Sequence, residues 1–174
     1  MQVSLITCTY NSEQTIKNCC ESIHHQTYND IEHIVVDKNS QDKTISIIKE
    51  FKVKDVRIYN QKSIGIYNAL NEGMKLCNGE IVGILHSDDE FIDREIISNI
   101  TSKFFEEKLD ILFSNIYYTK KNDVNKIIRK WKSNLEEGVQ SNSNLNKLIN
   151  KGWMPPHTTL FFKKDLLNEI GFYN

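Results

Sequence analysis

Ile81-Val82-Gly83-Ile84-Leu85-His86-Ser87-Asp88-Asp89 indicates the fold more clearly than any other segment of the chain. It is an apolar run that follows Gly79 and ends in two adjacent carboxylates, a pattern typical of a buried strand in a parallel sheet. Because side chains alternate across a strand, Asp88 and Asp89 are expected to point in different directions and to bind different groups. The alternative is that Ser87-Asp88-Asp89 forms only a turn and that Asp93 caps the following helix.

The sequence around this run alternates short apolar stretches with helical patterns. Strands are predicted at Val3–Thr9, Ile31–Val36, Val56–Tyr59 and in the run itself. Helices are predicted around the apolar stripe of residues 16–23, and over Thr44–Phe51, 66–77 and Asp93–Glu107. We expect Asn11 or Ser12 to cap the first helix. This order predicts an α/β fold with a mostly parallel sheet and helices on both faces.

The second half of the chain has a different pattern. Leu109–Thr119 and Lys126–Lys132 are predicted to be two strands joined by the turn Lys121-Asn122-Asp123. The segment Ser133–Asn146 is rich in Ser, Asn and Glu and is predicted to be a mobile loop. A further strand is predicted at Thr158–Lys164.

Length and cysteine content limit the class of protein. A chain of 174 residues can form one well-buried core, and we expect a single domain over residues 1–174. It has no apolar run of about 18 residues and no signal-peptide pattern after Met1, which predicts a cytoplasmic protein. The cysteines lack the spacing of metal ligands, which favours reduced core thiols over a zinc site; they are Cys8, Cys19, Cys20 and Cys77.

Charge is distributed unevenly along the chain. Residues 1–119 contain 12 Lys/Arg and 18 Asp/Glu, whereas residues 120–174 contain 10 and 5, so the balances of −6 and +5 give the net charge of −1. Residues 120–132 hold the basic cluster Lys120, Lys121, Lys126, Arg129, Lys130 and Lys132. This cluster suits phosphate, an anionic membrane or a partner, and the alternative is an edge hairpin whose lysines discourage strand pairing. It lacks a nucleic-acid-binding motif, so no nucleic-acid partner is expected.

Polar residues follow three of the predicted strands. They are Thr9-Tyr10-Asn11, Asp37-Lys38-Asn39-Ser40 and Ser87-Asp88-Asp89. Ligands of open α/β sheets bind outside the carboxyl ends of the strands, so these segments are expected to form one site. The chain has no Gly-x-Gly-x-x-Gly after its first strand and no P-loop, which argues against dinucleotide dehydrogenases and P-loop enzymes. A divalent metal on a carboxylate is the obvious other means of holding phosphate, and a second carboxylate can accept from ribose, as a nucleotide diphosphate requires.

Six segments, in this order, resemble the family 2 glycosyltransferases, which are inverting enzymes that use nucleotide-diphosphate sugars. The segments are 3–9 with Tyr10-Asn11, Ser22–Gln26 with Tyr28 and Glu32, 35–44, 65–73, 85–89 and Pro156-His157. The resemblance implies a GT-A Rossmann-like fold, which is a three-layer α/β/α sandwich with a mostly parallel central sheet. It also implies a nucleotide-sugar-binding half over about 1–92 and an acceptor-side half over about 93–174.

The resemblance also implies roles for individual residues. Thr9, Tyr10, Asn11 and Asp37 would bind the base, where the Asp37 carboxylate can accept from a base N–H. Asp88, beside Ser87, would face the ribose, and Asp89 would bind Mn²⁺ or Mg²⁺. Asn68 and Asn71 would line the pocket from the helix opposite, although Asn71 has the alternative of bonding local backbone. Asp42 is left out because it precedes a helix and is expected to cap or charge its start.

Two departures from the family pattern bear on activity. Asn68 stands where relatives often carry Asp, which changes how the nucleotide-sugar would be held. The usual catalytic base, an aspartate after a Gly-Phe pattern such as Gly171-Phe172, has no counterpart, so we expect a truncated chain, an inactive one, or another base. His157 is the candidate base on the acceptor side, and the alternative is that it positions a phosphate or an acceptor hydroxyl. Trp153 would either stack on an acceptor sugar or pack against its neighbours.

These features predict a metal-dependent inverting glycosyltransferase that moves a sugar, from a UDP-sugar in preference, to a glycan or lipid-linked acceptor in bacterial polysaccharide biosynthesis. The first alternative is a catalytically incomplete module that binds a nucleotide-sugar or a partner. The second is a nucleotidyltransferase, which the absence of a Gly-rich basic loop after the first strand disfavours. We also expect peripheral association with the inner face of the plasma membrane through residues 120–132. A homo-oligomer is a further expected assembly.

Overall fold

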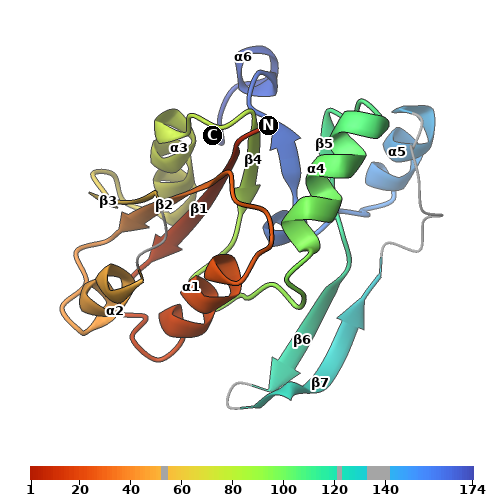
Figure 1. Cartoon of the computed structure of the whole chain (residues 1–174). Coiled ribbons are helices and arrows are strands. Elements are labelled where there is room, and N and C mark those ends of the chain that lie inside the picture. Colours follow the sequence, from red (N-terminus) through yellow and green to blue (C-terminus); the bar gives the residue numbers. More distant parts are fainter. Residues whose placement is uncertain (52–54, 121–122, 133–141) are drawn as a thin grey trace.

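The protein is described by a computed structural model that covers residues 1–51, 55–120, 123–132 and 142–174 (Figure 1). Residues 121 and 122 of the predicted turn and residues 133–141 of the predicted loop lie outside the described residues.

A six-stranded sheet with the order β3-β2-β1-β4-β8-β5 forms the centre of the molecule. Its strands are β1 (Val3–Thr9), β2 (Ile31–Asp37), β3 (Val56–Asn60), β4 (Ile81–Ile84), β5 (Ile111–Leu112) and β8 (Phe161–Lys163). The first four are parallel to one another, and β8 is antiparallel to β4 and β5. The prediction of an α/β fold with a largely parallel central sheet is therefore confirmed.

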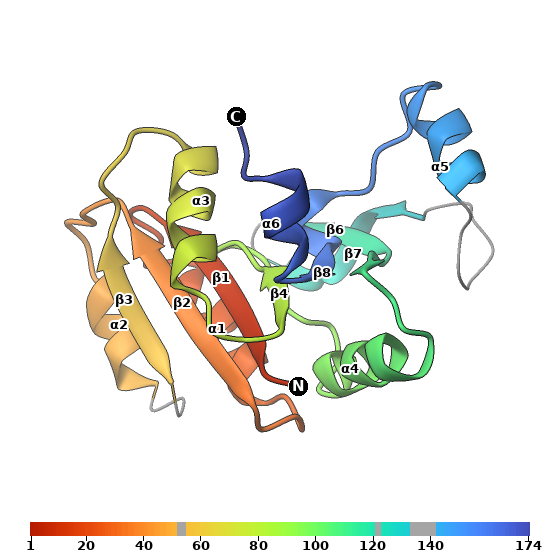
Figure 2. The same cartoon turned by 90° about the horizontal axis from the view of Figure 1, so that it is seen from above.

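Helices cover both faces of this sheet (Figure 2). One face carries α1 (Ile16–His24), α2 (Thr44–Glu50) and α4 (Ile96–Glu106), and the other carries α3 (Ile66–Leu76) and α6 (Leu166–Ile170). The remaining helical elements are α5 (Asn142–Ile149) and the short 3₁₀ helix η1 (His157–Thr159). Each face has its own apolar core, because β-strand side chains alternate: Leu5 packs with the α1 side and Ile6 with the α3 side. The molecule is thus the three-layer sandwich that the resemblance implied.

A separate two-stranded antiparallel sheet is formed by β6 (Ile116–Lys120) and β7 (Asp123–Trp131). Figure 1 shows this hairpin extending away from the six-stranded sheet.

Three predicted elements of the second half differ from the structure. The strand predicted at Leu109–Thr119 is two strands, because β5 pairs with β8 in the central sheet while β6 leaves it to pair with β7. The strand predicted at Thr158–Lys164 begins as η1, and only β8 is extended. The loop predicted at Ser133–Asn146 is wrong over residues 142–146, which belong to α5, because local helix formation overrides their polar composition.

The predicted cap of α1 is also wrong. Thr15 occupies the N-cap position and makes no side-chain capping bond. The side chains of Asn11 and Ser12 are engaged elsewhere, since Asn11 Oδ1 accepts from the Gln41 N–H at 2.9 Å and the Ser12 and Ser87 hydroxyls lie 2.9 Å apart. They join loops rather than start the helix.

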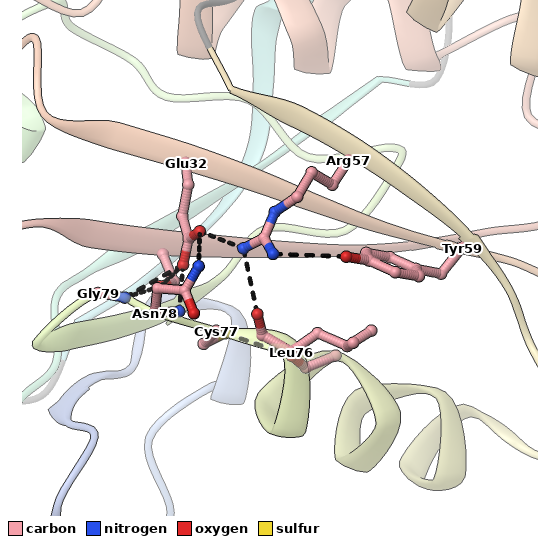
Figure 3. A network of polar contacts seen from close by, with 9 residues as sticks. Glu32, Arg57, Tyr59, Leu76, Cys77, Asn78 and Gly79 are labelled. Atoms are coloured by element: carbon pink, nitrogen blue, oxygen red, sulfur yellow. Dashed lines mark hydrogen bonds and ion pairs between the residues drawn. The ribbon is translucent and has the colours of Figure 1, made fainter.

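A buried carboxylate joins β2 to its neighbours at the end of the strand opposite to Asp37 (Figure 3). Glu32 is 1% exposed. The groups that donate hydrogen bonds to its carboxylate are Ser4 Oγ, the backbone N–H groups of Asn78 and Gly79, the Asn78 amide and the Arg57 guanidinium. Arg57 also donates to the carbonyl oxygen of Leu76 at 3.1 Å. This network connects β1, β2, β3 and the carboxyl end of α3.

The four cysteines are buried and unpaired, as predicted. Trp153 packs against Phe113 and Trp131, with ring centroids at 5.3 and 6.2 Å, which favours the packing alternative for this residue. Within the described residues, no helix has both the length and the apolar character needed to cross a membrane.

Candidate functional site

The carboxyl ends of β1 and β2 bring Thr9 and Asp37 side by side, because the two residues are register partners in the parallel ladder. Both are buried. Asp37 is held by Ser40, whose N–H donates to Oδ2 at 2.8 Å and whose hydroxyl donates to Oδ1 at 2.5 Å. The Thr9 hydroxyl is buried and finds no hydrogen-bond partner among the described residues. A buried hydroxyl without a partner is costly, so a ligand that bonded it would gain free energy.

The loop after β1 is fixed by the loop after β2. Asn11 has a φ of 47°, in the left-handed region that Asn tolerates better than most residues. Its N–H donates to Ser40 Oγ at 2.9 Å, so the same serine holds both Asp37 and Asn11. Tyr10 is exposed, and the ammonium of Lys38 lies 5.3 Å from its ring centroid. The predicted base-binding residues are therefore neighbours in space.

A cavity of about 330 Å³ lies beside the end of β4. Its lining residues are Cys8, Ile66, Tyr67, His86, Ser87, Asp88 and His157. It unites Ser87 and Asp88 with His157, although about 70 residues separate them in the sequence. Burial and, to a lesser extent, Glu72 raise the pKa of the Cys8 thiol to about 12, so a Cys8 thiolate is not available as a nucleophile.

His86 and His157 form a direct pair in this cavity. Their Nε2 atoms lie 2.8 Å apart and their rings meet edge to face, so one ring nitrogen donates to the other. Burial and the neighbouring His157 lower the pKa of His86, while Asp88 opposes this shift. At this distance one Nε2 carries the proton and the other accepts it, so the two rings hold complementary roles.

A second cavity, of about 450 Å³, shares Ser87 and Asp88 with the first. It is otherwise lined by Asn11, Ser12, Glu13, Gln14, Thr15 and Asp42. Asp42 accepts from the Thr44 N–H at the start of α2, as expected, and from the Glu13 N–H at 3.1 Å. It therefore both starts a helix and fixes the wall of this cavity.

Asp88 and Asp89 lie differently, but strand alternation is not the reason. The strand β4 ends at Ile84, Ser87 and Asp88 lie in a turn, and the Asp89 N–H donates to the carbonyl oxygen of His86 at 3.0 Å, so the turn alternative describes the local backbone. Asp88 is exposed and lines both cavities, whereas Asp89 is half-buried and lines neither of them. Burial and the charge of Asp88 raise the pKa of the Asp89 carboxyl to about 6. Burial and a neighbouring like charge thus disfavour the charged form of Asp89, and a cation bound to this carboxylate would stabilise it.

The residues around Asp89 suit a divalent metal that is held partly by the protein and partly by the substrate. Within the described part of the chain, no group of three or more His, Cys, Asp or Glu side chains is placed to hold a metal ion. Mg²⁺ in nucleotide sites is commonly held by one or two carboxylates and by the phosphates of the substrate. The single carboxylate of Asp89 fits that mode of binding and not a site made of protein ligands alone.

Neither cavity is lined by Asn68 or Asn71, nor by the predicted residues Thr9, Tyr10, Asp37 and Asp89. The Asn68 amide donates to the carbonyl oxygen of Ile64 at 2.7 Å. Asn71 donates to the carbonyl oxygen of Tyr173 at 2.8 Å and accepts from its N–H at 3.0 Å, so its amide holds the backbone of a distant segment rather than local backbone. The structure does not bring Asn68 or Asn71 to the cavities that Asp88 lines.

Conversely, the cavities contain residues that carry no predicted role. His86 stands just after the apolar run and two residues before Asp88. This position near a strand end could have indicated that His86 belongs to the site. Tyr67 precedes Asn68 and packs its ring on Tyr173 at 5.1 Å. The contact of Ser12 with Ser87 joins loops 75 residues apart, and no local pattern predicts it.

Comparison with known proteins identifies the family. Residues 4–171 match the family model described as glycosyl transferase family 2. The chain belongs to this family. It is 34% identical to glycosyltransferase GlyA of Streptococcus pneumoniae over 118 residues, which are 67% of this chain and 17% of GlyA. It is 38% identical to WfaP of Escherichia coli over 122 residues, which are 68% of this chain and 47% of WfaP. WfaP is named as a UDP-Glc:alpha-D-GlcNAc-diphosphoundecaprenol beta-1,3-glucosyltransferase. The chain thus spans less than half the length of either relative.

Solved structures show the same fold. The crystal structure of S. aureus TarS 1–349 in complex with UDP-GlcNAc has a TM-score of 0.72 at 24% identity, covering 97% of this chain and 47% of TarS. The mannosyltransferase PcManGT from Pyrobaculum calidifontis, in complex with GDP-Man and Mn²⁺, has a TM-score of 0.71 at 21% identity, covering 99% of this chain and 47% of that one. At these identities the similarity establishes the fold, which is GT-A.

Proposed function

We propose that this chain binds a nucleotide-diphosphate sugar, with UDP-sugars favoured, and transfers the sugar with inversion to a glycan or lipid-linked acceptor in bacterial polysaccharide biosynthesis. The observation that carries the proposal is that Thr9 and Asp37 end neighbouring parallel strands, while Asp88, in the turn after the parallel strand β4, lines a cavity together with Asn11 of the loop after β1. The unpartnered Thr9 hydroxyl and the exposed Asp88 carboxylate are suited to a polar ligand. The name of WfaP, a relative that uses UDP-Glc, supports the choice of nucleotide.

In this proposal each strand end binds one part of the nucleotide. The Asp37 carboxylate, fixed by Ser40, accepts from an N–H of the base. Asp88 accepts from a ribose hydroxyl, which leaves Asp89 as the carboxylate for a metal. Asn68 and Asn71 take part only if binding releases their present hydrogen bonds.

A divalent metal, when bound, supplies charge to stabilise the departing diphosphate. The protein's own contribution is that Asp89 holds the metal ion near the cavity lined by Asp88 and His157, where the sugar and the acceptor would meet. His157 is the candidate that removes the proton of the acceptor hydroxyl. For this, its Nε2 must give up the hydrogen bond to His86 and form one to the acceptor hydroxyl. His86 orients His157 until that exchange, so it is a positioning residue.

The acceptor side of the proposal concerns residues 93–174. A lipid-linked acceptor places the reaction at the inner face of the plasma membrane, and the basic segment 120–132 is the proposed contact with it. We further propose that the domain divides near residue 92 into a donor-binding half and an acceptor-binding half. Formation of a homo-oligomer is also part of the proposal.

The test is a calorimetric titration with UDP and with GDP, each with and without Mn²⁺, on the chain and on two matched variants. Asp89→Asn removes the proposed metal ligand with little change in volume. Asp30→Asn makes the same chemical change at an exposed position just before β2, at the opposite edge of the sheet. We expect Asp89→Asn to lose metal-dependent binding and Asp30→Asn to retain it.

The outcomes separate the proposal from its alternatives. Unchanged metal-dependent binding by Asp89→Asn would refute the assigned metal ligand. Binding of a nucleotide-sugar without transfer to any offered glycan or lipid-linked acceptor would favour the catalytically incomplete binding module.

A further inference from the structure

The β6–β7 hairpin has a composition unlike the rest of the molecule. From Ile116 to Lys132 the sequence contains six Lys/Arg residues and one Asp, a formal charge of +5, whereas the whole chain has −1 and the remainder therefore −6. Among the described strands, β6 and β7 pair only with each other. The hairpin is thus a positively charged projection from a negatively charged body (Figure 1).

Large apolar side chains are exposed on the same hairpin. The exposed fractions are 39% for Tyr117, 41% for Tyr118, 42% for Ile127 and 66% for Ile128. The register shows why Ile128 is exposed: Tyr118 pairs with Arg129 and Thr119 with Ile127, so Ile128 is an extra residue at a β-bulge. The bulge leaves an isoleucine without a cross-strand partner in a segment that is otherwise basic.

The two tyrosines carry cations on their rings. The Arg129 guanidinium lies 5.7 Å from the centroid of Tyr118, and the Lys130 ammonium lies 5.0 Å from that of Tyr117. Neighbouring positions on a strand face opposite sides, so both faces of the hairpin present such a pair. Each cation lies against one face of its ring, which leaves less of the ring open to the stacking that nucleic-acid bases use.

We propose that the β6–β7 hairpin docks on an anionic lipid membrane. Its Lys and Arg side chains would contact the negatively charged headgroups, and Ile127 and Ile128 would enter the interfacial region, where tyrosines are also favoured. The complementary sign of the charge selects an anionic surface, and the exposed isoleucines select a lipid surface over a soluble polyanion.

The alternative, that the basic residues only protect a strand edge from pairing, explains the charge and not the apolar residues. Exposed isoleucines on an edge hairpin increase the tendency to associate, so a purely protective segment would not carry them.

This inference deepens one part of the proposed function, the membrane contact through residues 120–132, and does not rest on sugar transfer, because lipid binding requires neither nucleotide nor acceptor. Figure 1 shows the hairpin extending toward the side on which the loop after β4 lies. A docked hairpin would therefore keep the cavities near the membrane. A chain that bound vesicles and no nucleotide would refute the proposed nucleotide-sugar chemistry alone, and a chain that bound nucleotide and no vesicles would refute the membrane contact alone.

The test is co-sedimentation with vesicles of phosphatidylcholine alone and with phosphatidylglycerol added. The test variant is Lys126→Glu/Arg129→Glu/Lys130→Glu, which keeps the strand edge charged and so preserves edge protection. The control, Lys17→Glu/Lys49→Glu/Lys108→Glu, changes the net charge equally on the body of the molecule. Each basic residue near an anionic surface contributes roughly a five-fold factor to binding, so we expect the test variant to bind at least about a hundred-fold more weakly. The control should retain most of the binding.

Ile128→Ser tests the apolar part separately. We expect it to weaken vesicle binding about ten-fold, most clearly at high salt, where the electrostatic part is screened. Equal sedimentation with both kinds of vesicle, equal losses in test and control variants, or tighter binding to polyphosphate or an oligonucleotide than to the anionic vesicles would each overturn the proposal. Circular dichroism establishes that every variant is folded.

Discussion

Replacing Glu32 by Gln tests the buried network that ties together the parallel half of the sheet (Figure 3). The substitution keeps the size of the side chain and one acceptor oxygen but removes the charge and turns an amide toward the Arg57 guanidinium. Charge-assisted hydrogen bonds contribute about 1.5–3 kcal/mol each, and breaking a buried ion pair costs about 3–5 kcal/mol. Because the Arg57 side chain is 30% exposed and can reach water, we expect a loss of about 2–3 kcal/mol in the free energy of unfolding.

The pH dependence of this loss gives a second readout. Burial by itself raises the pKa of Glu32, but the hydrogen bonds from Ser4, Asn78 and Gly79 and the charge of Arg57 lower it below its ordinary value of 4.5. A carboxyl whose pKa is lower in the folded state stabilises the protein above 4.5, and this contribution is lost as the pH falls. The difference between the parent chain and Glu32→Gln should therefore be largest near neutral pH and shrink below pH 4.5.

The assay is urea unfolding followed by far-UV circular dichroism at several pH values. A double-mutant cycle with Arg57→Met isolates the coupling of the pair. Because the network lies at the end of β2 opposite to Asp37, nucleotide affinity of the folded variant should not change. A loss below about 1 kcal/mol, or a loss that does not vary with pH, would refute the reasoning.

Two further predictions concern β4 and the carboxylates after it. In Gly83→Ala the new Cβ would lie 2.3 Å from Cε1 of the buried Phe161 ring on the neighbouring strand, so we expect a loss of about 1–3 kcal/mol in thermal or urea unfolding. An unchanged melting temperature would contradict the packing described. Asp89→Asn should instead stabilise the protein by about 1–3 kcal/mol at pH 7, because burial and Asp88 raise the pKa of that carboxyl from 3.8 to about 6 in the folded state. The gain should disappear below about pH 4, where the carboxyl is protonated in both states; a variant less stable than the parent at pH 7 would contradict it.

The first half of the fold could be predicted from sequence because its signals are local. The strands β1 to β4 are short apolar runs, and α1 and α3 carry apolar residues at helical spacing, so periodicity alone places them. The second half depends on non-local pairing. The change of partner between β5 and β6, and the antiparallel insertion of β8 between β4 and β5, are set by contacts that no local pattern contains.

The same distinction applies to the site. Thr9 and Asp37 end neighbouring parallel strands, and Asp88 lies in the turn after the parallel strand β4, so their placement at the carboxyl edge of the sheet could be predicted. The pairing of His86 with His157 could not, because it depends on where η1 packs against β4. The engagement of Asn71 by the backbone of Tyr173 joins positions 102 residues apart and likewise has no local signal.

We propose above all that the carboxyl edge of the sheet, where Asp37, Asp88 and Asp89 lie, binds a nucleoside diphosphate together with a divalent metal. The most direct measurement is calorimetric titration of the unaltered chain with UDP, first in the presence of a chelator and then with Mn²⁺. We expect binding that appears or strengthens when Mn²⁺ is present, and little binding of Mn²⁺ without UDP, because the Asp89 carboxylate alone makes an incomplete metal site and the described residues hold no group of three or more possible ligands. No binding of UDP or GDP under either condition would contradict the claim.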